Sequence, residues 1–101
     1  MSAARLVFHP DAADEYADAA QWYGERSAAV HDAFVTEVER VFRLIVAFPN
    51  RWPPYGPRHR RVLVRRFPYS VVYLEKGGRL WVVAVAHAKR KPFYWIKRTI
   101  L

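Results

Sequence analysis

The residues of this chain that are best suited to chemistry are basic and aromatic, and they gather in its second half. Residues 51–101 hold thirteen of the seventeen Lys and Arg residues, with Glu75 as the single acidic residue among them. Clustered cations attract polyanions or acidic proteins. Placed around a scissile phosphate, they could also stabilise the charge of a phosphoryl-transfer transition state without a metal ion. The segregated charge therefore predicts an acidic partner for the C-terminal half.

The candidate site residues form two basic runs with aromatic residues nearby. The first run lies on a predicted strand and consists of Arg58, Arg60, Arg61, Arg65 and Arg66. The second lies near the end of the chain and consists of His87, Lys89, Arg90, Lys91, Lys97 and Arg98. Trp52, Tyr55, Tyr94 and Trp95 offer rings on which bases could stack. If the strands that carry the two runs lie near each other, we expect the cations to converge on one edge of a sheet.

Two of these residues could move a proton, and each has a simpler structural alternative. His87 or Tyr94 would serve as the acid or base of a nuclease. The alternative for His87 is a strand-end histidine bonded to the backbone. For Tyr94 and Trp95 it is packing of a terminal turn against the core. The acidic residues of the first predicted helix are interpreted as its solvated face rather than as a catalytic carboxylate pair.

Composition excludes several classes of site. The chain has 101 residues, 52% of them hydrophobic, which predicts one domain with its own core. It lacks cysteine, so disulfides and thiolate metal sites are impossible. Its four histidines are scattered, and it carries neither a P-loop nor a dinucleotide fingerprint. Without a signal-like or membrane-length apolar segment, we expect a cytoplasmic protein that uses no cofactor or metal and does not engage a membrane.

The first half of the chain predicts a strand and two helices. Residues 4–9 alternate as a short strand, and Pro10 is well placed at the start of a helix from Asp11 to Arg26. Ser27 can cap a second helix with an apolar stripe that begins at Val30 and ends at Phe48. The short connection between the helices predicts an antiparallel pair.

The second half predicts a meander of three strands. The strands are expected over residues 58–67, 69–75 and 79–87, the last two joined by a turn at Gly77-Gly78. The strand over residues 79–87 is apolar on both sides, so we expect it inside the sheet. The order β-α-α-β-β-β predicts an α+β fold, in which a helical hairpin packs on a mainly antiparallel four-stranded sheet.

At this point the sequence resembles a known family. The segments HPDAADEYADAAQWY, AFPNRWP, RRVLVRRFPYSVVY and AVAHAKRKPFYWIKR, in this order and at these distances, are similar to toxins of the RelE/ParE superfamily, often described as plasmid-stabilisation proteins. The resemblance covers nearly the whole chain. It implies the toxin of a type II toxin–antitoxin pair, in which a small antitoxin wraps and masks the toxin. It also allows a homodimer or a toxin–antitoxin hetero-oligomer.

The resemblance also implies which residues would form a nuclease site, if there is one. RelE-like members cleave mRNA on the ribosome with basic residues and a terminal aromatic or histidine, and ParE-like members poison DNA gyrase. The matching catalytic candidates here are Arg61, Arg65, His87, Lys89, Arg90 and Tyr94. Leu63 and Ser70 depart from the nuclease pattern, since they stand where a lysine and an arginine are usual.

Three hypotheses follow for the function. The departures at Leu63 and Ser70 favour ParE-like inhibition of DNA gyrase. The alternative is a RelE-like, metal-free, ribosome-dependent mRNA endonuclease. A third is a non-toxic remnant kept for binding an antitoxin. All three share a surface for the antitoxin.

Overall fold

The computed structural model describes residues 6–100, and their elements follow the order β-α-α-β-β-β. They are β1 (Leu6–Phe8), α1 (Pro10–Gly24), α2 (Ala28–Ala47), β2 (Arg60–Leu63), β3 (Tyr69–Lys76) and β4 (Arg79–His87). The predicted α+β fold, a helical hairpin on a four-stranded sheet, is confirmed. Residues 4 and 5 of the first predicted strand lie outside the described residues.

Local sequence signals explain where the helices begin. Pro10 opens α1, and the Nδ1 atom of His9 accepts a hydrogen bond of 3.0 Å from the backbone N–H of Asp11. The hydroxyl of Ser27 accepts a hydrogen bond of 3.3 Å from the N–H of Val30, so Ser27 caps α2 as predicted. The stripe of α2 is buried at its centre, whereas Val30 and Phe48 at its two ends are exposed.

The strand β2 is shorter than the predicted strand over residues 58–67. On its N-terminal side, Arg60 pairs with Pro54 of the preceding loop. On its C-terminal side the chain turns, and Arg66 adopts a positive φ of 70°, which no strand residue has. The pairing of β2 with β3 is therefore limited to Arg60–Leu63.

The sheet has the order β1-β4-β3-β2, so β4 lies inside it as predicted. β1 runs parallel to β4, and the other neighbours are antiparallel. β3 separates β2 from β4, which means that the two basic runs do not lie on adjacent strands. Their convergence therefore depends on side chains that reach across β3, and on the segment after β4.

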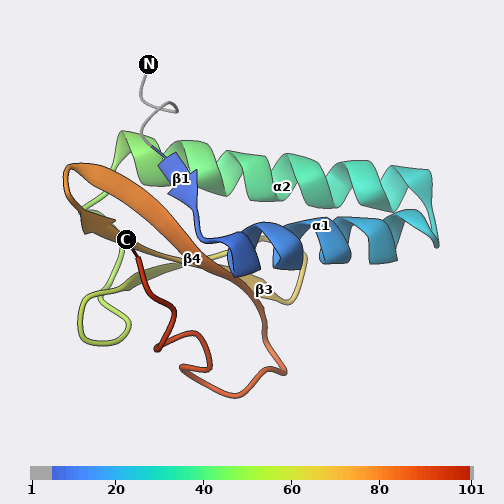
Figure 1. Ribbon diagram of the computed structural model, residues 1–101. Helices are drawn as coiled ribbons and strands as arrows, with labels where there is room; N and C mark the ends of the chain where they lie inside the picture. The colour runs from blue at the N-terminus through green and yellow to red at the C-terminus, as the bar shows by residue number, and fades with distance from the viewer. Residues whose placement is uncertain (1–5, 101) are drawn as a thin grey trace.

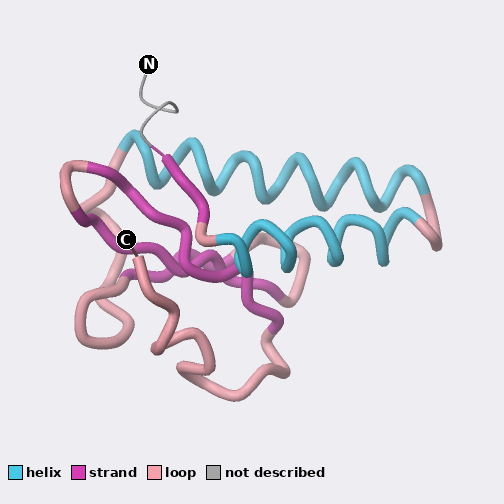
Figure 2. Tube along the Cα trace, viewed as in Figure 1, coloured by secondary structure: helices cyan, strands magenta, loops and turns pink. Residues whose placement is uncertain are grey.

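The two faces of the sheet have different covers, as Figures 1 and 2 show. The helical hairpin packs on one face over a core that includes Phe34, Val71 and Val82. Residues 88–100, which we call the C-terminal tail, cross the other face, where Trp95 and Ile100 are buried. Because both faces of the sheet are covered, we expect the functional side chains at its edges and beside the tail.

A bulge in the β3–β4 pairing interrupts the alternation of side chains along β4. Val72 pairs with Ala84 while Tyr73 pairs with Val82, so Val83 is an extra residue. As a result Val83 and Ala84 both pack with the tail-side cluster, and Val85 packs with the helix-side core.

No helix within residues 6–100 is long and apolar enough to span a bilayer.

Candidate functional site

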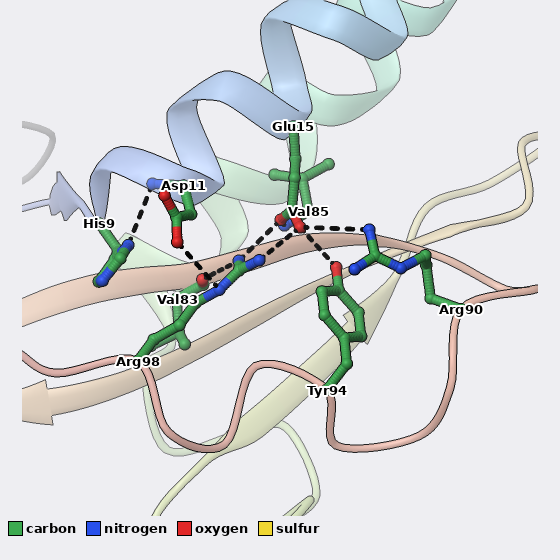
Figure 3. A network of polar contacts seen from close by, with 8 residues as sticks. All are labelled: His9, Asp11, Glu15, Val83, Val85, Arg90, Tyr94 and Arg98. Carbon is green, nitrogen blue, oxygen red and sulfur yellow. Dashed lines mark hydrogen bonds and ion pairs between the residues drawn. The ribbon is translucent and has the colours of Figure 1, made fainter.

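The carboxylate of Glu15 on α1 is the centre of a polar network that holds the C-terminal tail (Figure 3). Its Oε2 accepts hydrogen bonds from the Tyr94 hydroxyl at 2.7 Å and from the Arg98 guanidinium at 2.8 Å. Its Oε1 accepts from Arg98 at 3.0 Å and from the backbone N–H of Val85 at 3.0 Å. The guanidinium of Arg90 lies 3.9 Å from Oε2. One carboxylate thus holds three side chains of the tail and one backbone group of β4.

The sheet topology explains why a carboxylate is needed here. β1 pairs only with Leu80–Val82, so the edge of β4 is bare beyond that point. Buried backbone groups must be satisfied. The N–H of Val85 donates to Glu15, and the carbonyl of Val83 accepts from Arg98 at 2.9 Å. Two side chains therefore complete the edge where β1 stops.

Glu15 corrects the interpretation of the acidic residues of α1 as a solvated face. Its side chain is only 16% exposed, and that of its partner Arg98 only 14%. Asp14 and Asp18, in contrast, are exposed as expected. Position on the helix decides the difference, because Glu15 faces the bare edge of β4.

The network keeps the Tyr94 hydroxyl and the Arg98 guanidinium protonated. Burial, the hydrogen bond to Glu15 and its negative charge raise the pKa of the Tyr94 hydroxyl well above its usual range. The hydrogen bond to Glu15 raises the pKa of Arg98, although burial opposes this. Tyr94 is therefore a stable hydrogen-bond donor to Glu15, and its hydroxyl releases its proton less readily than a free tyrosine does.

His87 and Trp95 adopt the structural alternatives. The Nδ1 atom of His87 accepts a hydrogen bond of 3.0 Å from the backbone N–H of Lys89, which places this histidine at the turn that ends β4. Trp95 is buried in the tail-side cluster, with Tyr94 packed against it. Tyr94 and Trp95 thus pack on the sheet, whereas the preceding residue, Phe93, is exposed.

A second feature is a pocket of about 240 Å³ between the tail and the sheet, which we call the tail pocket. Arg61 of β2, Ser70 of β3, and Arg90 and Lys91 of the tail line it. The Arg61 guanidinium lies 3.9 Å from the centre of the Tyr55 ring, over its face. Among the described residues that line this pocket there is no Asp or Glu. The two basic runs therefore meet here, across β3.

A groove of about 570 Å³ lies at the edge strand β2 and shares the residue Arg61 with this pocket. Arg61 lines both the pocket and the groove, and Arg51 and Arg65 line the groove. The structure thus brings Arg61, His87, Arg90 and Tyr94 around one pocket and places Arg65 beside it. The predicted residues that do not line the tail pocket are Trp52, Arg58, Arg60, Arg65, Arg66, Lys89, Lys97 and Arg98.

Comparison with known proteins identifies the family. Residues 6–92 match the model described as "ParE toxin of type II toxin-antitoxin system, parDE". The chain belongs to the ParE toxin family. No curated protein sequence matches it. A chain of the solved structure described as "Chromosomal ParDE TA system from P. aeruginosa" superposes with a TM-score of 0.72 at 16% identity, over 83% of this chain and 95% of that one. That likeness supports the fold.

Two residues of this ParE-family chain were not singled out from the sequence as site residues. Glu15 belongs to an acidic run whose other members are exposed, and the length of β1 was the missing information. Phe93 has a positive φ of 62°, which is unusual for a residue other than glycine. The only signal for it was its place in the run Pro92-Phe93-Tyr94-Trp95.

The histidine and acidic residues do not assemble into a metal site. Within residues 6–100, no three His, Asp or Glu side chains are grouped so that they could hold a metal ion.

Proposed function

We propose that this chain is the toxin of a type II toxin–antitoxin pair that arrests growth in the cytoplasm by binding DNA gyrase. Membership of the ParE toxin family supports the toxin assignment. The observation that carries the choice of mechanism is the position of Glu15. Its carboxylate accepts a hydrogen bond from the Tyr94 hydroxyl, a group that mRNA cleavage would need free, and it also binds Arg98.

Electrostatics argue against phosphoryl transfer at the Glu15 network. A metal-free nuclease must place positive charge around the scissile phosphate, and it needs a side chain that is free to donate or accept a proton. Here the carboxylate offsets the charge of Arg98, and the Tyr94 hydroxyl is held as its donor. The Nδ1 atom of His87 already accepts a hydrogen bond from the N–H of Lys89. The absent cations at Leu63 and Ser70 point the same way.

The second half of the pair is an antitoxin, and the charge of this chain indicates its chemistry. The formal net charge is +8, and the excess lies in residues 51–101. We infer that the antitoxin segment in contact with this half is acidic. Its association rate and affinity should then fall as the salt concentration rises.

The experiment compares two activities of one preparation. The toxin is purified as its antitoxin complex, released, and added to purified gyrase with relaxed plasmid, and in parallel to ribosomes programmed with mRNA. We expect supercoiling to be blocked and the mRNA to stay intact, with both samples restored to control behaviour by added antitoxin. Cleaved mRNA with unaffected supercoiling would establish the nuclease instead.

A further inference from the structure

The tail pocket has the features of a binding site that the Glu15 network lacks. Arg61 approaches it from β2, and Arg90 and Lys91 approach it from the tail, on either side of Ser70. Among the described lining residues no carboxylate offsets these cations, although Arg90 also lies 3.9 Å from Glu15. An anion that enters would therefore meet the charges of Arg61 and Lys91 and the Ser70 hydroxyl, with Arg90, which Glu15 partly offsets, beside them.

Stacking prepares the pocket for a phosphate. The guanidinium carbon of Arg61 lies 3.9 Å from the centre of the Tyr55 ring, which is a cation–π contact. A guanidinium held by a ring loses less freedom when it donates two parallel hydrogen bonds, which is the geometry that phosphate oxygens accept. The volume of about 240 Å³ leaves room for one phosphate group and part of its sugar, but not for a double helix.

Phe93 provides a second, independent observation at the mouth of the pocket. Its backbone has a φ of 62°, an unfavourable conformation for a bulky residue, and its ring is 42% exposed. The ring stacks on Tyr55, with centroids 5.0 Å apart and planes 22° apart. An exposed ring beside cations is a platform on which a nucleic-acid base can stack.

The adjoining groove extends the same chemistry along a chain. Arg61 lines both cavities, and Arg51 and Arg65, from the segments before and after β2, line the groove. An acidic peptide would use these cations but would have no need of an exposed ring beside them. Successive phosphates with a base between them use both, so the observations favour a nucleic-acid strand.

We propose that the tail pocket binds a phosphodiester group of a DNA strand, with the adjoining base on Phe93, and leaves the strand uncut. The inference rests on the proposed function and deepens it, because the substrate of gyrase is DNA. The toxin would hold the DNA strand and the enzyme together. Cleavage is not expected, because the Tyr94 hydroxyl is held as a donor to Glu15 and Leu63 and Ser70 stand where the nuclease pattern has cations.

The test is a fluorescence-anisotropy titration of a labelled single-stranded oligodeoxynucleotide with the free toxin, without gyrase. Arg61→Ala is compared with Arg79→Ala, which removes the same charge from an exposed position beside the Gly77-Gly78 turn, away from the pocket. We expect R61A to weaken binding about tenfold and R79A by less than about twofold. Phe93→Leu should weaken binding by about fivefold or more, because a stacked base is lost.

Salt gives a second readout of the same contact. Removing one phosphate contact should lower the slope of log K against log salt by about 0.7 in R61A and leave it unchanged in R79A. Equal losses in R61A and R79A would overturn the inference, since the attraction would then be diffuse. The melting temperature of each variant, measured alongside, separates lost contacts from lost folding.

Three further arms identify the source of the anion. An RNA of the same sequence, or a polyglutamate peptide, that binds more tightly than the DNA and depends on Arg61 would overturn the choice of DNA. A shortened oligonucleotide after incubation would overturn the claim that the strand stays uncut. Gyrase inhibition without any DNA binding would sink this inference alone, and DNA binding without gyrase inhibition would sink the proposed function alone.

Discussion

The cations around the C-terminal tail belong to two regions that differ in one carboxylate. On the side of α1, Arg98 is buried against Glu15 and completes the edge of β4. On the side of the tail pocket, Arg61 and Lys91 line a cavity in which no described lining residue is acidic. The same residue types are structural in the first region and available for binding in the second.

This difference shows that charge in a sequence does not report its availability. A basic residue beside a bare sheet edge is recruited to satisfy backbone groups, and a carboxylate follows to balance it. Arg61, which lies over the Tyr55 ring, has no Asp or Glu among the described residues that line its pocket. Removing groups from each region should therefore have opposite consequences: stability falls in the first and binding falls in the second.

The largest expected effect comes from Glu15→Ala. It removes the carboxylate partner of the Arg98 guanidinium, and it removes the hydrogen-bond acceptor of the Tyr94 hydroxyl and of the Val85 N–H. Breaking such a pair on one side should cost about 3 kcal/mol in the free energy of unfolding. Urea denaturation of the purified toxin measures it.

Asp18→Ala is the matched control, because Asp18 is an exposed carboxylate on the same helix. It should change the free energy of unfolding by less than about 0.5 kcal/mol. If E15A and D18A behaved alike, the contrast between the two regions would be lost.

Tyr94→Phe removes only the hydroxyl that donates to Glu15 at 2.7 Å. We expect a loss of about 2 kcal/mol in the free energy of unfolding, because the acceptor is charged. Tyr55→Phe is the control in the other region, since the ring and its stacking with Arg61 and Phe93 are kept. A variant Y94F as stable as Y55F would mean that the hydroxyl does not anchor the tail.

Alkaline pH should weaken the helix-covered side of the sheet. Burial raises the pKa of Tyr73, whose hydroxyl donates to the carbonyl of Pro49, from 10.0 to about 12. The folded state therefore holds its proton longer than the unfolded state, so this contribution is complete below pH 10.0 and lost as the pH rises through about 12. Unfolding followed across that range should show the decline, and Tyr73→Phe should reduce it. A decline of equal steepness in Y73F would contradict the assignment to this group.

The smallest effect should appear at acid pH and comes from His59, which is buried against Trp95 beneath the tail. Burial, and then the charge of Arg58, lower the pKa of its imidazole below 6.5. Its contribution to stability is present above pH 6.5 and lost as the pH falls through the folded pKa. His59→Phe should flatten the stability profile on that side, by about 1 kcal/mol or less. An unchanged profile would show that folding does not lower the pKa of His59.

The sequence predicted the elements well because their signals are local. Pro10 and Ser27 mark helix starts, and the Gly77-Gly78 turn joins two alternating strands, so each could be recognised without knowledge of the rest. The bulge at Val83 could not, because it depends on the register between β3 and β4.

The candidate site was predicted only in part, because it depends on distances across the sheet. The meeting of Arg61 with Arg90 requires the tail to fold back over β3. The role of Glu15 requires β1 to stop at Phe8, which leaves the N–H of Val85 for a side chain. Neither condition has a signature in the spacing of the residues themselves.

A double-mutant cycle between Glu15 and Arg98 tests most directly whether one carboxylate separates the two regions. The free energies of unfolding of the wild type, Glu15→Gln, Arg98→Gln and the double variant are measured at neutral pH. The hydrogen bonds of 2.8 and 3.0 Å between these side chains predict a coupling energy of about 2 kcal/mol. A coupling below about 0.5 kcal/mol would show that the pair does not hold the tail.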